Sequence, residues 1–441
     1  MEVVDRVIQI LLPLRRRLLR AIQWSILGTG IAHAVYLLAS ILIARRLGNE
    51  DFGRLGLIQF TLNTPVLLIA TSFGWSVMRT AATMHEHERE AFSSLLNSLI
   101  IVGTLVSAGL SVLLLLLGPM ICTYWFSDPA SIPAFQIVAI SILFSGYFSL
   151  IVSLFSGLEA FQNVAILNIM RGLLLGILLI VGSNWGGLIG AGFGFTLASG
   201  MSAFIAWFIM RRALKQYRLA LYSHNWQRAY RVLAQISLPS FLSTIISSLG
   251  LWIGSVLLAR HHDGLHQVAV FNASNQWKSV LLFVPTQISQ ASAPIMANLW
   301  SKNDLFKLKA VVRSNLLLML LTYGLPSVPI LAFSSHILHL YLLSGDEETE
   351  AMRFIILSGL MSALCGVLGY AMVAMGKAWQ ALAANTFWTV IFLMTALLWL
   401  SQGVLGISKS YCFSYFVLFI AISVYIFYTL TKQKEVVRSC S

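Results

Sequence analysis

Residues 21–44 read AIQWSILGTGIAHAVYLLASILIA and carry no charge, although Arg20 and Arg45 flank them. A helix needs about 20 apolar residues to cross roughly 30 Å of hydrocarbon, so this stretch is long enough to span a bilayer. A second uncharged stretch of 24 residues follows between Arg54 and Arg79. The sequence therefore predicts two membrane-spanning helices joined by a short polar turn.

The composition of the whole chain agrees with a membrane protein. Of its 441 residues, 58% are hydrophobic and 10% are charged, and the mean hydropathy is +0.82. About a quarter of a soluble domain is charged, so this chain could not cover a soluble surface. We therefore exclude a cytosolic enzyme, a disordered chain and, despite a pI of 9.8, a nucleic-acid-binding protein. The four cysteines stand singly with no CxxC spacing, so we expect apolar fillers and neither a disulfide nor a metal site.

Charges and glycine-rich breaks divide the chain into twelve spans. We predict six in the first half, at residues 22–44, 55–78, 94–117, 132–156, 164–182 and 187–210. We predict six more in the second half, at residues 235–259, 268–298, 314–334, 351–374, 379–401 and 405–430. Gly186, Gly190 and Gly194 are spaced by four, which predicts a close-packing face on the sixth span.

Lysine and arginine set the orientation of these spans. Twelve spans place both termini on one side, and 21 Lys and Arg residues fall on that side against six on the other. Cytoplasmic loops carry the excess, so both termini are predicted to be cytoplasmic. We expect residues 1–21 to form an amphipathic segment on the cytoplasmic leaflet, with a frayed basic tail as the alternative. A basic linker at 211–234, which could serve only to set topology, and a tail at 431–441 are also predicted to be cytoplasmic.

Two short matches indicate an internal repeat. They pair Leu42-Ile-Ala-Arg45 with Leu257-Leu-Ala-Arg260, and Glu159-Ala-Phe-Gln162 with Lys377-Ala-Trp-Gln380, at offsets of 215 and 218 residues. Each match falls at the same place in the predicted topology, and repeats of six spans insert in the same direction. We predict an all-α polytopic fold with twelve transmembrane helices in two six-helix bundles, at 22–210 and 235–430. The bundles should be related by pseudo-twofold symmetry about the membrane normal.

Several motifs resemble a known family. The stretch from Ile43 to Gly53, with Arg45-Arg46-Leu-Gly48 at its centre, is similar to the signature after the first helix of bacterial polysaccharide flippases. The second half resembles O-antigen (Wzx-type) flippases at Pro239-Ser-Phe-Leu242, Phe271-Asn272-Ala-Ser-Asn275-Gln276-Trp277 and Pro294-Ile-Met296. Both groups belong to the multidrug/oligosaccharidyl-lipid/polysaccharide exporter superfamily.

The resemblance implies a function in the bacterial inner membrane. The chain would flip an undecaprenyl-diphosphate-linked sugar repeat unit from the cytoplasmic to the periplasmic leaflet, without a cofactor and with H+ or Na+ as coupling ion. Expected partners are the lipid-linked oligosaccharide, membrane lipids, an O-antigen polymerase and a chain-length regulator. Arg45, Arg46 and Arg260 would form a motif at the periplasmic ends of the helices.

Two cations inside the predicted spans suggest where a substrate binds. A charge at the bilayer centre costs about 2.5–3.5 kcal/mol on insertion scales, so Arg171 and Lys278 are functional candidates. No Asp or Glu lies at comparable depth, which favours an anionic substrate and a cationic central cavity. The alternative is that both cations snorkel or bond helix carbonyls.

An oligosaccharide also needs polar neighbours, because moving one unpaired hydroxyl from water to alkane costs about 4–8 kcal/mol. Trp252 or Trp277 could stack on sugars. Interhelical hydrogen bonding is the alternative role for all of these positions. The polar candidates are His33, Asn63, Asn168, Asn272, Asn275, Gln276 and Asn385.

Two other functions remain as alternatives. A cation-coupled multidrug exporter of the same superfamily would need intramembrane carboxylates, which the spans lack. A polymerase or ligase would need an extracytoplasmic site, and loops such as 260–267 and 343–350 are too short to build one. His85-Glu86-His87-Glu88 and the histidines at 261, 262 and 266 have metal-ligand chemistry, but we interpret both groups as solvated loops.

Overall fold

The computed structural model describes the backbone of residues 2–84, 89–216, 226 and 238–440, and the side chains of 28–82, 93–215, 226 and 241–431. Every regular element in these ranges is helical. The first half contains α1 (Glu2–Ile69), η1 (Ala70–Gly74), α2 (Trp75–Met84), α3 (Arg89–Met120), η2 (Ile121–Trp125), η3 (Pro129–Ser131), α4 (Ile132–Ala139), α5 (Ser141–Gly157) and α6 (Phe161–Gln216). The second half contains α8 (Leu238–Ala259), α9 (Gly264–Ser301), α10 (Leu305–Met319), η5 (Leu320–Gly324), α11 (Leu325–Ala332), α12 (Ser334–Leu340), α13 (Asp346–Ala374), α14 (Ala378–Leu398), η6 (Leu400–Gln402) and α15 (Gly403–Cys440).

These helices cross the molecule twelve times, as predicted. Ten stretches of the described chain are long and apolar enough to span a membrane, and two of them have 55 residues. Each of these two folds back on itself at glycine. Gly48 (φ 79°) divides α1 into a first and a second pass, and Gly186 and Gly187 (φ 55° at Gly187) divide α6 in the same way. Glycine suits both turns because it has no Cβ to oppose a positive φ.

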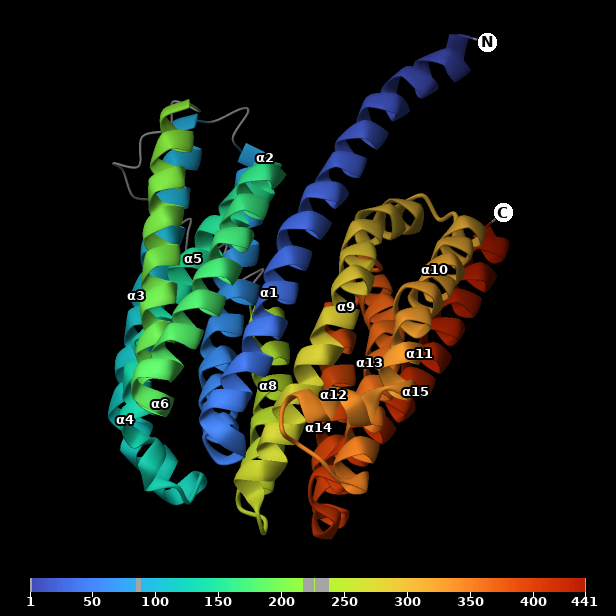
Figure 1. The fold of residues 1–441 in the computed structure, drawn as a ribbon. Helices are drawn as coiled ribbons and strands as arrows, with labels where there is room; N and C mark the ends of the chain where they lie inside the picture. The colour runs from blue at the N-terminus through green and yellow to red at the C-terminus, as the bar shows by residue number, and fades with distance from the viewer. Residues whose placement is uncertain (1, 85–88, 217–225, 227–237, 441) are drawn as a thin grey trace.

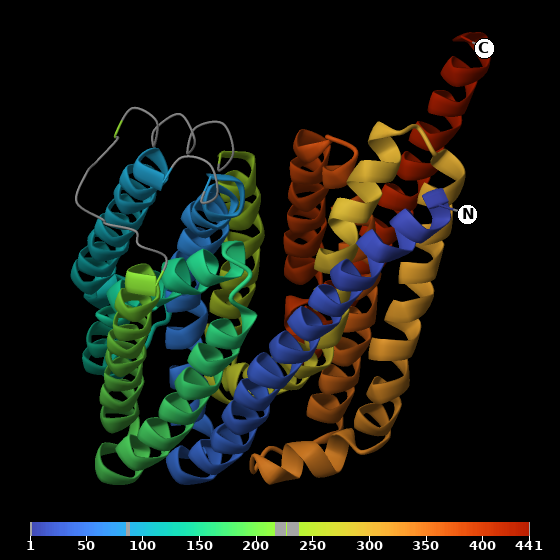
Figure 2. The same ribbon diagram turned by 90° about the horizontal axis from the view of Figure 1, so that it is seen from above.

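The passes form two lobes that stand side by side (Figures 1 and 2). The elements α1 to α6 build the first lobe, and α8 to α15 build the second. Both ends of the described chain lie at one end of the bundle, which we call the terminal end, and the opposite end is the distal end (Figure 1). The first pass of α1 begins over the second lobe and descends into the first. This pass therefore connects the two lobes.

The glycine-rich sixth span packs differently from the prediction. Gly186 lies in the turn and has no neighbouring atom within 4 Å of a Cβ built on it. A Cβ on Gly190 would overlap the carbonyl oxygen of Gly182, and one on Gly194 would overlap that of Leu178. Close packing therefore involves two of the three glycines, and it brings together the two passes of α6.

Some predictions concern residues that lie outside the described ranges. They include most of the basic linker at 211–234 and the cluster His85-Glu86-His87-Glu88. The backbone of α1 is helical from Glu2 onward. The boundaries of the lobes, the amphipathic role of residues 1–21 and the role of the tail at 431–441 remain predictions.

Candidate functional site

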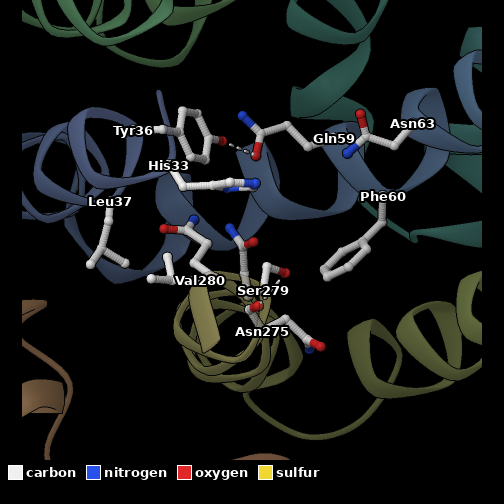
Figure 3. A pocket seen from close by; sticks show the side chains of 11 residues that line it. His33, Tyr36, Leu37, Gln59, Phe60, Asn63, Asn275, Ser279 and Val280 are labelled. Carbon is white, nitrogen blue, oxygen red and sulfur yellow. Dashed lines mark hydrogen bonds between the residues drawn. The ribbon is translucent and has the colours of Figure 1, made fainter. Parts of the chain in front are cut away.

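A polar cavity of about 210 Å³ lies where the two lobes meet. Both passes of α1 supply one wall and α9 of the second lobe supplies the other (Figure 3). The eleven lining residues are His33, Tyr36, Leu37, Gln59, Phe60, Asn63, Asn272, Asn275, Gln276, Ser279 and Val280.

Eight of these eleven side chains are polar, and none is Asp, Glu, Lys or Arg. The Tyr36 hydroxyl donates to Gln59 Oε1 at 3.0 Å, which leaves the Gln59 amide nitrogen turned away from that bond. Asn272 Nδ2 and Gln276 Oε1 are buried and have no hydrogen-bond partner in the protein. A buried polar group without a partner costs about 1–3 kcal/mol, so these two amides favour a ligand that both accepts and donates.

A polar stripe on α9 explains one wall of the cavity. Asn272, Asn275, Gln276 and Ser279 follow the spacing i, i+3, i+4 and i+7, which places them on one face of a helix. Asn272, Asn275 and Gln276 were predicted from the sequence, whereas Ser279 was missed. Gln59 lies four residues before Asn63, and Tyr36 lies three residues after His33. Each pair therefore also shares one face of its helix. This spacing was the signal that could have identified Tyr36 and Gln59.

Glycine allows the lobes to touch on the distal side of this cavity. A Cβ built on Gly53 would overlap the carbonyl oxygen of Leu265 in the second lobe. One turn later, a Cβ on Gly56 would approach Asn272 Nδ2 to 2.9 Å. The glycine that ends the stretch Ile43–Gly53 therefore lets α1 contact the start of α9 backbone to backbone.

Hydrogen bonds between the lobes surround this contact, and we call them the distal contacts. Arg45 Nε donates to the Leu340 carbonyl at 2.8 Å, and Asn49 Nδ2 donates to that of Leu342 at 3.2 Å. From the other lobe, Arg260 Nη2 donates to the Tyr124 carbonyl at 3.0 Å. Arg45 and Arg260 occupy equivalent positions in the repeat, and each bonds a backbone carbonyl of the opposite lobe. Arg46, the third arginine of the predicted motif, is exposed at the same end.

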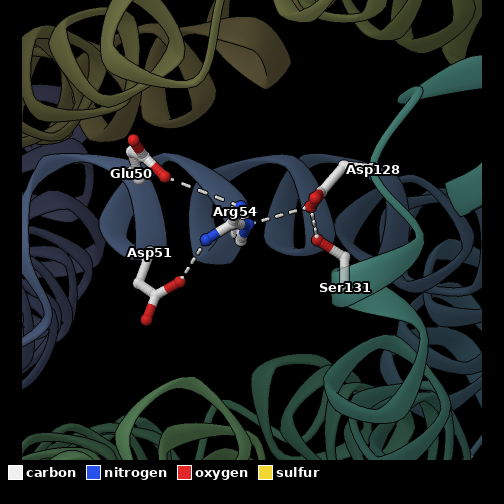
Figure 4. Close-up of polar contacts among 5 residues, drawn as sticks. All are labelled: Glu50, Asp51, Arg54, Asp128 and Ser131. Atoms are coloured by element: carbon white, nitrogen blue, oxygen red, sulfur yellow. Dashed lines mark hydrogen bonds and ion pairs between the residues drawn. The ribbon is translucent and has the colours of Figure 1, made fainter.

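Arg54 organises the distal edge of the first lobe (Figure 4). Its guanidinium contacts Asp51 at 2.7 Å and Glu50 at 3.7 Å, and Nε donates to Asp128 at 3.0 Å. Asp128 also accepts from the hydroxyl of Ser131. Asp128 precedes η3, so the cluster ties the turn of α1 to the loop before α4. This fixes the edge of the first lobe from which Arg45 and Asn49 reach across.

The two intramembrane cations do not line the cavity, and the structure does not bring them together. Arg171 Nη2 donates to Ser145 Oγ at 3.2 Å, and its guanidinium lies 4.7 Å from the ring centre of Phe148, both in the first lobe. Lys278 is 6% exposed, and its Nζ lies 4.1 Å from the ring centre of Tyr411 in the second lobe. The expected cationic wall is absent from the described cavity because each cation is held by aromatic and hydroxyl groups of its own lobe.

The remaining candidates divide between the lobe interface and the lobe interiors. Asn168 donates to Thr29 at 3.1 Å inside the first lobe, and Asn385 donates to Ser243 at 2.6 Å inside the second. Trp252 donates to Thr61 at 2.9 Å and packs against Trp125, so it belongs to the seam between α8 and α1. Trp277 packs against the hydrophobic core and does not line the cavity. His266, from the second histidine group, lies 3.5 Å from Glu348.

Comparisons with known proteins agree on a family and a fold. A family model described as polysaccharide biosynthesis protein matches residues 18–300, and one described as MatE matches residues 239–398. The chain is 27% identical over 213 residues to the EPS I polysaccharide export inner membrane protein EpsE of Ralstonia nicotianae, which is 45% of each chain. The protein of the same name from Ralstonia solanacearum is 27% identical over 199 residues, or 41% of this chain and 43% of that one. The chain thus spans about half the length of the curated relatives it matches.

Solved structures show the same fold. An inward-facing multidrug resistance MATE family transporter of the MOP superfamily superposes with a TM-score of 0.81 at 12% identity, over 93% of this chain and 99% of that one. A MOP superfamily transporter from Pyrococcus furiosus superposes with a TM-score of 0.72 at 14% identity, over 94% and 96%. The twelve-helix arrangement in two bundles is therefore shared with these transporters.

Proposed function

We infer the function of this chain from its family, since it belongs to the polysaccharide biosynthesis protein family, whose model covers residues 18–300. It is a multi-pass membrane transporter of the exporter superfamily. We propose that it flips undecaprenyl-diphosphate-linked sugar repeat units from the cytoplasmic to the periplasmic leaflet of a bacterial inner membrane. The proposed energy source is a gradient of H+ or Na+, and the proposed partners are a polymerase and a chain-length regulator.

The uncharged, amide-rich cavity between the lobes is the observation that carries this proposal. A sugar headgroup presents many hydroxyls, and each needs a donor or an acceptor when it leaves water. Asn and Gln side chains offer both, and Asn272 and Gln276 still have an unbonded atom. The cavity would then bind sugar hydroxyls while the lipid tail stays in the bilayer.

The distal contacts support an alternating-access mechanism. If the terminal end is cytoplasmic, these contacts close the path to the periplasm in the described conformation. Release on the far side would require Arg45, Asn49 and Arg260 to leave the carbonyls of the opposite lobe. Such contacts are bistable, because they are either made or broken as the lobes tilt.

The alternative is a cation-coupled multidrug exporter of the same superfamily. Its substrates are organic cations, which bind best beside carboxylates. No Asp or Glu lines the described cavity, and this disfavours the alternative.

Deleting the gene and analysing lipid-linked intermediates tests the proposed function. We expect undecaprenyl-diphosphate carrying one complete repeat unit to accumulate, with its sugar in the cytoplasmic leaflet. Membrane vesicles of defined orientation, treated with a periodate reagent that cannot cross the bilayer, would measure the leaflet. Sugar that reacts from the periplasmic face would contradict flipping and would instead indicate a polymerization defect.

The proposed orientation makes a second prediction. Alkaline phosphatase is active only in the periplasm, so a fusion after Lys215 should be inactive and one after Asp346 should be active. Matched fusions to green fluorescent protein, which folds in the cytoplasm, should give the reverse pattern. Phosphatase activity after Lys215 would overturn the orientation and the direction of transport that rests on it.

A further inference from the structure

An apolar groove of about 800 Å³ runs along the outside of the first lobe, between α5 and the second pass of α6. Phe144 and Tyr147 line it from α5, and Phe193, Phe204 and Trp207 line it from α6. Phe193 and Phe204 are 61% and 65% exposed, so the groove faces the lipid. None of these residues belongs to the cavity between the lobes.

Gly200 makes this face a groove instead of a ridge. A Cβ built on Gly200 would have the ring of Phe144 as its nearest neighbour at 3.7 Å, which is ordinary van der Waals distance. A Cβ at this position would therefore rest against Phe144 without moving the backbone, and a longer side chain would extend into the groove that Gly200 lines. The groove lies between two helices, α5 and α6.

A cation lies at the terminal end of the groove. The guanidinium of Arg211 lies 4.2 Å from the ring centre of Trp207. Trp207 and Tyr147 both line the groove. Arg212, the next residue, instead lies over Phe208, which is outside the groove. In the described part of the chain, Arg211 has no ion pair with a carboxylate.

Hydrophobicity alone cannot select a ligand here, because lipid tails are as apolar as the groove itself. Selection must come from shape and from the headgroup. Five aromatic side chains line the groove, and the face of an aromatic ring packs well against the methyl branches of an isoprenoid. Arg211 adds a partner for phosphate at the end of the molecule that is proposed to be cytoplasmic.

We propose that this groove binds the single isoprenoid tail of a polyprenyl phosphate lipid, with the phosphate against Arg211. The proposal rests on the proposed function, since it names the carrier lipid of the same substrate class. The groove would recruit the carrier at the cytoplasmic leaflet, and the cavity between the lobes would receive the sugar.

Binding to the purified full-length protein in nanodiscs tests the proposal, with undecaprenyl phosphate as the probe and native mass spectrometry as the readout. Undecaprenol has the same tail without the phosphate, and phosphatidylglycerol has one negative charge on two straight tails. We expect undecaprenyl phosphate to bind at least tenfold more tightly than either. Equal binding of phosphatidylglycerol would overturn the proposal, because the site would then hold any acidic lipid of the bilayer.

Two pairs of variants locate the site. Gly200→Leu fills the groove and should weaken undecaprenyl phosphate binding at least tenfold, whereas Gly109→Leu, at an exposed glycine of α3 with open space around it, should not. Arg211→Gln should weaken undecaprenyl phosphate but not undecaprenol, and Arg212→Gln should change neither. Wild-type affinity in both Gly200→Leu and Arg211→Gln would overturn the proposal.

The failure of this proposal differs from a failure of the proposed function. If the groove does not bind the probe and the deletion strain still accumulates cytoplasmic lipid-linked units, the groove proposal alone is wrong. If the groove binds the probe and the deletion leaves export intact, the flippase function is wrong and the lipid site remains.

Discussion

Gly53→Ala should strongly lower polysaccharide export, although it adds only one methyl group and does not alter a residue of the cavity lining. The new Cβ would overlap the carbonyl oxygen of Leu265, a backbone atom that cannot move aside as a side chain can. Overpacking of this kind costs about 1–3 kcal/mol, which would shift the balance between closed and open distal ends by roughly 5- to 150-fold. A transporter whose distal end closes less often completes fewer transport cycles. Surface polysaccharide, measured beside the amount of inserted protein, reports the effect.

Gly30→Ala is the matched control for this prediction. Gly30 lies on the first pass of α1 and faces the same partner α9, but its Cβ would find the ring of Phe283 at 3.8 Å and fit without strain. We therefore expect normal export from this variant. In Gly53→Ala, a cysteine pair placed across the distal contacts should also cross-link less than in an otherwise wild-type background. Normal export together with normal cross-linking in Gly53→Ala would contradict the prediction. It would show that the backbones of α1 at position 53 and α9 at Leu265 can move apart without a cost in free energy.

The order of the helices could be predicted because bilayer insertion depends on local composition. Charges end the spans, and each span of roughly 20 apolar residues must form a helix to satisfy its backbone. The glycine turns at Gly48 and Gly187 were also recognisable, since both follow an apolar run of spanning length. The tandem glycine motif was partly wrong, because Gly186 lies in the turn between the fifth and sixth spans, where the predicted bounds already left it, and does not lie on the packing face.

The direction in which a side chain points could not be predicted from spacing alone. Arg171 and Lys278 are charged residues within apolar helices. From the sequence, the side chain of each could lie either in a cavity or in the interior of a lobe. The structure places each beside an aromatic ring of its own lobe, Phe148 and Tyr411. These rings are distant in sequence, and nothing local marks them as partners. Lys278 also lies off the polar stripe of α9, and that stripe was the better guide to the cavity.

Asn63→Asp should lower export by tenfold or more, whereas Asn63→Lys should be tolerated much better. Asn63 is an exposed member of the cavity lining, so an aspartate there would be ionised. One negative charge opposing another at about 8 Å costs about 2 kcal/mol at an effective dielectric constant of about 20, or roughly 30-fold in affinity, so an aspartate here would repel an anionic lipid-linked substrate as it enters the cavity. Neither intramembrane cation lines the cavity to neutralise it. Export and the amount of inserted protein are the measurements.

The two substitutions control for each other, because each places one charge of opposite sign at the same exposed position. Damage to helix packing would lower export in both, and it would also lower the amount of inserted protein. The sign also separates the two candidate functions. An exporter of organic cations should be helped by Asn63→Asp and hindered by Asn63→Lys, with resistance to cationic drugs as the readout. If Asn63→Asp raised transport and Asn63→Lys lowered it, the result would contradict the flippase proposal. The cavity would then be a site for cations, because the negative charge of the aspartate would attract the substrate and not repel it.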